Sequence, residues 1–132
     1  MRKGVIGIAA GALVVFSAWL AYSKVSQARR ETAYRAAIAP FQRDLSPGTA
    51  RANVEKYLDS RGVAYHWMYD GGSAASYFVR IGEEPGGLAC KSWKAYIVFQ
   101  FDASDRQRDD VLKLDPFDKL KDVQIKKMGT CL

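Results

Sequence analysis

The fold is decided by the run Trp93-Lys94-Ala95-Tyr96-Ile97-Val98-Phe99-Gln100-Phe101. Its odd-numbered residues are all apolar or aromatic, and its even-numbered residues mix polar with apolar side chains. Successive side chains of a β-strand point to opposite faces of the sheet, so this alternation predicts a strand. The face that carries the odd-numbered residues is apolar throughout, and we expect other parts of the chain to cover it.

Two earlier runs, residues 63–69 and 76–81, alternate in the same way. Asp70-Gly71-Gly72 lies between them and is typical of a turn, because Asp-Gly tolerates positive φ. Glu84-Pro85-Gly86-Gly87 ends the second run. Three alternating runs in succession predict an antiparallel sheet with one covered face.

A short amphipathic helix over residues 49–61 is the natural cover for that face. Thr49 is the expected N-cap and Gly62 the expected stop. The apolar residues recur at helical spacing, and they are Ala50, Val54, Tyr57 and Leu58. Four charged residues fall outside this stripe, namely Arg51, Glu55, Lys56 and Asp59.

The last thirty residues carry a weaker pattern. Residues 103–108 are polar and turn-like, and residues 109–114 fit either a strand or a short helical turn. Residues 120–128 alternate moderately and predict a closing strand. Residues 46–132 therefore predict one small α+β domain of two layers, with the short helix packed on an antiparallel sheet of three to five strands.

The N-terminus predicts a transmembrane helix ahead of this domain. Met1-Arg2-Lys3 is followed by an uncharged stretch over residues 4–22, which is just long enough to cross a hydrocarbon core of about 30 Å. Trp19 and Tyr22 stand at its far end, where aromatic rings favour the headgroup layer. We expect a membrane anchor at residues 1–23 and a membrane-proximal helix or linker at residues 24–45.

A cleavable signal peptide is the alternative for the same stretch. The nearest small-x-small triplets are Ala21-Tyr22-Ser23 and Ser26-Gln27-Ala28, and neither is a strong cleavage site. The apolar run is also longer than the usual signal-peptide core of about 7–15 residues. An uncleaved signal-anchor is therefore favoured.

The chain has two cysteines, Cys90 and Cys131, and both lie in the C-terminal part. A small domain outside the cytoplasm commonly uses such a pair as a disulfide, which is our prediction; two free thiols are the alternative. With the anchor, the disulfide predicts a single-pass inner-membrane protein whose C-terminal domain faces the bacterial periplasm.

The net charge of +6 is concentrated at the N-terminus. Five of the 20 Lys and Arg residues fall in residues 1–30, so 15 basic and 14 acidic residues remain in the rest of the chain. A nearly neutral domain lacks the basic face that nucleic-acid binding requires, and this class of function is excluded. Lys24, Arg29 and Arg30 instead suit contact with anionic membrane lipid.

No catalytic constellation is recognisable in the sequence. His66 is the single histidine, and no Ser or Asp is paired with it by spacing. A structural zinc site needs four ligands, which two cysteines and one histidine do not supply. We therefore predict a protein that is not an enzyme and that has no catalytic, cofactor or metal site.

Binding to another protein is favoured instead. If the second face of the sheet is uncovered, His66, Met68, Phe78 and Tyr96 form an exposed aromatic patch of the kind that marks a partner site. The alternative is that the long helix or the C-terminal segment covers these residues. Gly7 and Gly11 form a GxxxG motif that allows close helix–helix contact and so a homodimer.

The stretch Leu45-Ser46-Pro47-Gly48-Thr49-Ala50-Arg51-Ala52-Asn53-Val54-Glu55-Lys56-Tyr57-Leu58 resembles the opening segment of the BamE/SmpA-type small envelope domains. In that family a Gly-x-Thr turn opens a short helix with Val and Leu at buried positions, and a β-meander follows. The resemblance covers residues 45–62 and the order of the strands. It implies a fold, an envelope address and protein partners. The chain departs from the family in having an apolar span where the family has a lipid-modified cysteine.

The sequence thus predicts a non-catalytic, membrane-anchored periplasmic module that binds another protein; its specific role is left open, and envelope assembly is one candidate. An immunity or inhibitor protein that acts against a periplasmic toxin or enzyme is an alternative within the same class. Two alternatives belong to other classes. One is an enzyme centred on His66, and the other is a small-ligand sensor with a pocket between helix and sheet.

Overall fold

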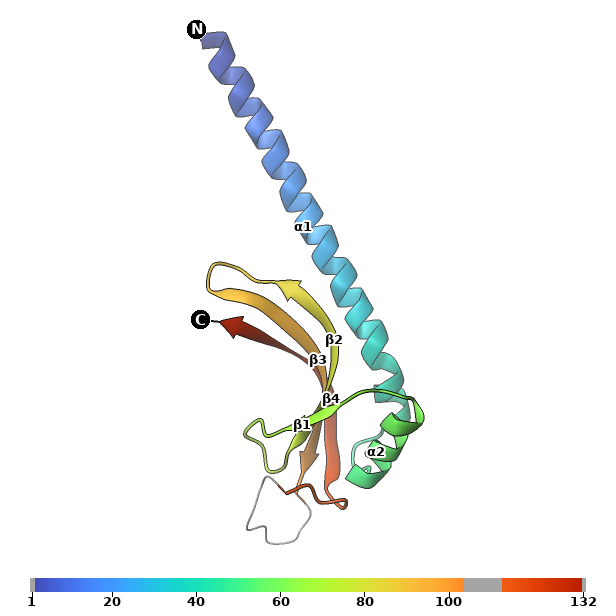
Figure 1. Ribbon diagram of the computed structural model, residues 1–132. Helices are drawn as coiled ribbons and strands as arrows, with labels where there is room; N and C mark the ends of the chain where they lie inside the picture. Colours follow the sequence, from blue (N-terminus) through green and yellow to red (C-terminus); the bar gives the residue numbers. More distant parts are fainter. Residues whose placement is uncertain (1, 104–112, 132) are drawn as a thin grey trace. The chain divides into compact units, whose positions relative to one another are not determined.

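The computed structural model describes residues 2–103 and 113–131, with side chains from Gly11 onward. The predictions for residues 104–112 lie outside the described residues. Two helices and four strands are present (Figure 1): α1 (Arg2–Asp44), α2 (Arg51–Ser60), β1 (His66–Met68), β2 (Ser76–Pro85), β3 (Cys90–Asp102) and β4 (Lys119–Cys131).

The four strands form one antiparallel sheet in the order β1-β2-β3-β4, so each strand pairs with its neighbour in the sequence. The register aligns Trp67 with Tyr77, Tyr77 with Phe99, and Phe99 with Val123. Residues that lie opposite one another share a face of the sheet. The α+β class and the antiparallel meander agree with the alternation of the three apolar runs.

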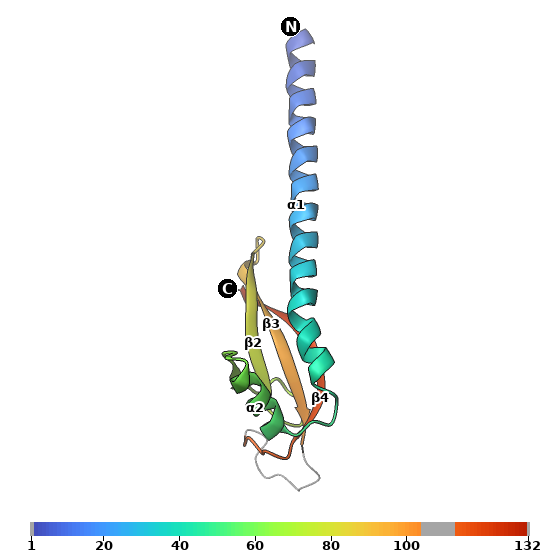
Figure 2. The same cartoon turned by 90° about the vertical axis from the view of Figure 1, so that its right-hand side faces the viewer.

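The chain divides into two compact units, residues 1–35 and residues 36–132. In the second unit, Val54 and Leu58 of α2 are fully buried in one core with the odd-numbered face of β3. Phe41, in the last turns of α1, packs edge-to-face on Phe99 with ring centroids 5.5 Å apart. Figure 2 shows α2 on the side of the sheet that faces the viewer. The stripe predicted for residues 49–61 is therefore part of this core.

The start of α2 differs from the predicted cap. Ala50, not Thr49, is the N-cap residue, and it makes no side-chain capping bond. Backbone carbonyls of the segment before β4 take over this role, because Arg51 N–H donates to Asp118 O at 2.7 Å and Ala52 N–H donates to Pro116 O at 3.2 Å. The free N–H groups of a helix N-terminus need such acceptors.

The predicted transmembrane helix is wrong. Among the side chains that the structure describes, which begin at Gly11, no helix is long and apolar enough to cross a membrane. This finding corrects the predicted membrane anchor and, with it, the predicted single-pass inner-membrane location with a periplasmic domain.

The predicted disulfide is confirmed. Cys90 and Cys131 are directly opposite in the register of β3 and β4, with their Cα atoms 4.0 Å apart, and they are paired. The pair closes a stretch of 41 positions in the sequence and ties the first residue of β3 to the end of β4. The free-thiol alternative is therefore excluded.

Candidate functional site

The strand β1 carries the most exposed large aromatic side chains of the sheet. It is an edge strand and pairs with β2 over three residues only. Trp67 is 49% exposed, and Tyr69, just beyond the strand, is 39% exposed. The ring of Tyr65 packs on Tyr77 with centroids 4.9 Å apart, so the core supports one end of this row. We call Tyr65, Trp67 and Tyr69, together with the free edge of β1, the aromatic edge.

The aromatic edge carries no formal charge. Between Arg61 and Asp70 the sequence holds only apolar and aromatic residues, glycine and His66. Edge strands that avoid association usually carry charged residues, especially lysine, or proline. This edge has neither.

The other edge of the sheet, β4, is protected. Its first half is covered by main chain, because Gly48 N–H donates to Leu120 O at 2.7 Å and Leu120 N–H donates to Thr49 O at 2.8 Å. The Gln42 amide donates to Val123 O at 3.0 Å. Four lysines also lie along the strand: Lys119, Lys121, Lys126 and Lys127. The β4 edge is therefore covered by main chain and carries lysines, whereas the β1 edge is uncharged.

The structure brings the four predicted surface residues together on the second face of the sheet. The ring of His66 lies 5.8 Å from that of Phe78 and 6.0 Å from that of Tyr96, and Met68 packs against the same cluster. Phe78 is fully buried, however, and Tyr96 is 9% exposed. His66 alone of the four is exposed, and Met68 is half-buried.

The expected exposed aromatic patch at Phe78 and Tyr96 is therefore wrong, and these two rings belong to a small second core. Met128 of β4 packs against this core, so the C-terminal strand helps to cover it, as the alternative expected. The helix contact predicted for Gly7 and Gly11 stays a prediction. Gly7 lies among the residues whose side chains are not described, and the space beside Gly11 is open.

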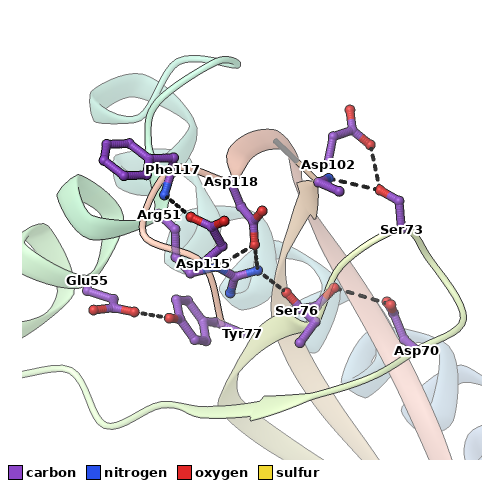
Figure 3. Close-up of polar contacts among 12 residues, drawn as sticks. Arg51, Glu55, Asp70, Ser73, Ser76, Tyr77, Asp102, Asp115, Phe117 and Asp118 are labelled. Carbon is purple, nitrogen blue, oxygen red and sulfur yellow. Dashed lines mark hydrogen bonds and ion pairs between the residues drawn. The ribbon is translucent and has the colours of Figure 1, made fainter. Parts of the chain in front are cut away.

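Arg51 departs furthest from the position that the sequence pattern predicts for it. It falls outside the apolar stripe of α2, yet it is fully buried. Its guanidinium donates to Asp118 Oδ2 from Nε at 3.1 Å and from Nη2 at 3.0 Å, and Nη2 also donates to Ala75 O at 2.7 Å (Figure 3). The guanidinium carbon lies 4.1 Å from the centroid of the Phe101 ring.

Tyr77 extends this buried polar cluster toward α2. Its hydroxyl donates to Glu55, and its ring lies 5.0 Å from the Arg51 guanidinium carbon (Figure 3). Burial raises the pKa of Tyr77, and the Glu55 carboxylate raises it further. The cluster connects α2, β2 and the segment before β4, and β2 is the strand with which β1 pairs.

No group of three or more His, Cys, Asp or Glu residues that could hold a metal ion occurs among the residues that the structure describes. The ring contacts of His66 are with aromatic neighbours. An apolar depression of about 270 Å³ lies beside β4, lined by Leu45, Pro47 and Val123 among others. It is the nearest counterpart to the pocket that a ligand sensor would need.

Comparison with known proteins gave no relative. No protein-family model, curated protein sequence or solved structure matches the chain. The resemblance of residues 45–62 to BamE/SmpA-type domains therefore stays a prediction.

Proposed function

We propose that this protein is a non-catalytic binding module that takes an extended segment of another protein as an added strand on β1. The observation that carries the proposal is the aromatic edge, which is uncharged and exposes Trp67 and Tyr69 beside a free strand edge. Strand addition combines main-chain hydrogen bonds with side-chain contacts at alternate positions.

The side chains of the aromatic edge have enough free surface to contribute to binding. Trp and Tyr bury about 150–250 Å² when they are enclosed, and 49% and 39% of these two side chains are exposed. Covering that remainder at about 25 cal/mol per Å² contributes roughly 3–5 kcal/mol as an upper value. Each main-chain hydrogen bond adds about 0.5–1.5 kcal/mol. The expected partner segment is extended and mainly apolar.

The neutral domain and the rigid base of β1 also fit a binding role. Residues 31–132 carry nearly balanced charge, so apolar contacts and main-chain hydrogen bonds are the expected sources of affinity. The buried Arg51–Asp118 pair holds the elements behind β1 in one arrangement. An assembly factor and an inhibitor of a toxin or enzyme both belong to this class, and the identity of the bound protein separates them.

Site-specific photo-cross-linking tests the proposal. A photoreactive phenylalanine analogue replaces Trp67 or Tyr69 in the full chain, within cells of the source organism. The control carries the analogue at Lys56, an exposed position on α2. We expect one adduct of discrete mass from positions 67 and 69 and none from position 56. Adducts of equal yield from all three positions, or from none, would contradict the proposal.

A further inference from the structure

The sheet that the structure describes has one covered edge and one open edge. The first half of β4 is covered by main chain of residues 48–49, through hydrogen bonds that Leu120 donates and accepts. At the opposite end of the sheet lies β1, and residues 62–69 hold no Lys, Arg, Asp or Glu. An open strand edge without charge is a template for pairing with another chain. A second copy of this chain carries the same template.

The length of β1 defines one symmetric register for two copies. Two β1 strands can pair antiparallel about a two-fold axis perpendicular to the sheet. Directly opposite residues then share a face, so their numbers are both odd or both even. The register that pairs all three residues of β1 places Trp67 opposite Trp67 and His66 opposite Met68. It also places Tyr65 opposite Tyr69.

The side chains that meet in this register are compatible. The exposed rings of Trp67 and Tyr69 lie opposite aromatic rings, and aromatic pairs across strands stabilise a sheet. The nearest charged residues in the sequence are Arg61 and Asp70, and in this register both fall opposite uncharged positions, 73 and 64. Like charges directly opposite one another would destabilise the pairing, and this register contains none.

The surface available for this contact is small. Trp67 is 49% exposed and Tyr69 39% exposed, and an enclosed Trp or Tyr buries about 150–250 Å². Covering both residues on both copies therefore removes roughly 250–450 Å² from solvent. A strand of three residues adds too little main chain to reach the roughly 1,200–2,000 Å² of a stable interface. The expected dimer is weak and reversible.

We propose that β1 pairs with β1 of a second copy in this register, and that the dimer masks the aromatic edge from a partner segment. The inference rests on the proposed function, because both occupants use β1 as the strand on which they pair. The covered edge of β4 ends the association at two molecules, so the interface is isologous and closed. The aromatic edge is then free in dilute chain and masked in concentrated chain.

Introduced cysteines test the register in the full chain, because the two native cysteines are paired with each other. Tyr65→Cys and Tyr69→Cys chains with tags of different size are mixed at about 100 µM each and oxidised with copper phenanthroline. Opposite positions lie about 4.5–5.5 Å apart at Cβ, whereas position 65 lies about 13 Å along the strand from its own copy. We expect a mixed-tag dimer on a non-reducing gel, at about tenfold or more the yield from either variant alone.

Two further comparisons complete the test. Trp67→Cys keeps Tyr65 on the core and should cross-link to itself, because Trp67 lies opposite Trp67. Adding Trp67→Lys to both tagged chains places two ammonium groups opposite each other and should lower the mixed-tag yield by about tenfold or more. The control Leu88→Lys adds the same charge at a fully exposed residue between β2 and β3 and should leave the yield unchanged.

Two results would overturn self-pairing. One is an equal yield from the mixture and from either variant alone, and the other is the absence of a cross-linked dimer from every variant in chains that remain folded. Strand addition by another protein would survive both results, since the adduct at position 67 in cells tests it separately. A register-specific dimer without any such adduct would instead contradict the proposed partner and leave self-pairing in place.

Discussion

The buried pair of Arg51 and Asp118 gives the sharpest prediction for the fold. Side-chain exposure is 1% for Arg51 and 0% for Asp118, and two hydrogen bonds join them. Asp118→Ala would leave the Arg51 guanidinium buried without its counter-ion. Breaking a buried pair in this way typically costs about 3–5 kcal/mol. The contacts of Arg51 with Phe101 and Tyr77 would remain and would offset a small part of this.

We therefore expect Asp118→Ala to lower the free energy of unfolding by about 3 kcal/mol. The double variant Arg51→Met/Asp118→Val removes both charges and adds little volume, so it should lie within about 1 kcal/mol of the wild-type chain. A lower free energy of unfolding in the single variant than in the double variant indicates an unpaired buried charge. A lost packing contact would not produce it.

Urea unfolding followed by tryptophan fluorescence measures these values. At a slope of about 1.5 kcal/mol/M, the loss in Asp118→Ala moves the midpoint down by about 2 M. Lys56→Ala, at an exposed position of α2, is the control and should change stability by less than about 0.5 kcal/mol. Asp118→Asn keeps the shape of the side chain and serves if the alanine variant does not fold. A loss below about 1 kcal/mol for both single variants would refute the reasoning.

Three further predictions concern other parts of the second unit. Replacing Cys90 and Cys131 together by serine should lower stability by about 3–4 kcal/mol, because the disulfide spans 41 positions; calorimetry on both forms measures this. Because the pKa of Tyr77 is raised, the folded state holds the hydroxyl proton of Tyr77 more tightly than the unfolded state does. The stabilisation that this gives the folded state is complete below about pH 10 and falls as the pH rises above that value. Unfolding measured from pH 8 to 11 should show a shallower decline for Tyr77→Phe, and parallel curves would contradict the assignment. A Cβ at Gly86 would overlap the carbonyl of Cys90, so Gly86→Ala should disrupt the β2–β3 hairpin. The space around Gly87 is open, so Gly87→Ala should be tolerated. The melting temperature should therefore be lower for Gly86→Ala than for Gly87→Ala.

The alternating runs determined the sheet because their period fixes which side chains share a face. The rows of Tyr77, Phe99 and Val123 follow from that period once the strands pair in order. The disulfide was also predictable, since the two cysteines have few other roles in so small a domain. The strand β1 is shorter than its alternating run. Gly62 adopts a positive φ of 66° and Val63 N–H still donates to Leu58 O at 3.1 Å, which delays the start of the strand.

The buried polar cluster was beyond the reach of local patterns. Arg51 and Asp118 are 67 positions apart, and the helical stripe assigns Arg51 to the polar side of α2. Its burial depends on the chain returning to the N-terminus of α2 before β4 begins, which no periodicity encodes. The sequence left open whether the face around Phe78 is covered, because the cover comes from long side chains on neighbouring strands, among them Met68 and Met128.

The most direct test of the binding proposal is amide hydrogen exchange in the presence of the partner segment that cross-links to position 67. Strand addition predicts slower exchange, by tenfold or more, at amides of residues 66–69 that otherwise face solvent, and unchanged exchange in α2. Unchanged exchange at residues 66–69, with protection elsewhere on the domain, would contradict strand addition at the aromatic edge.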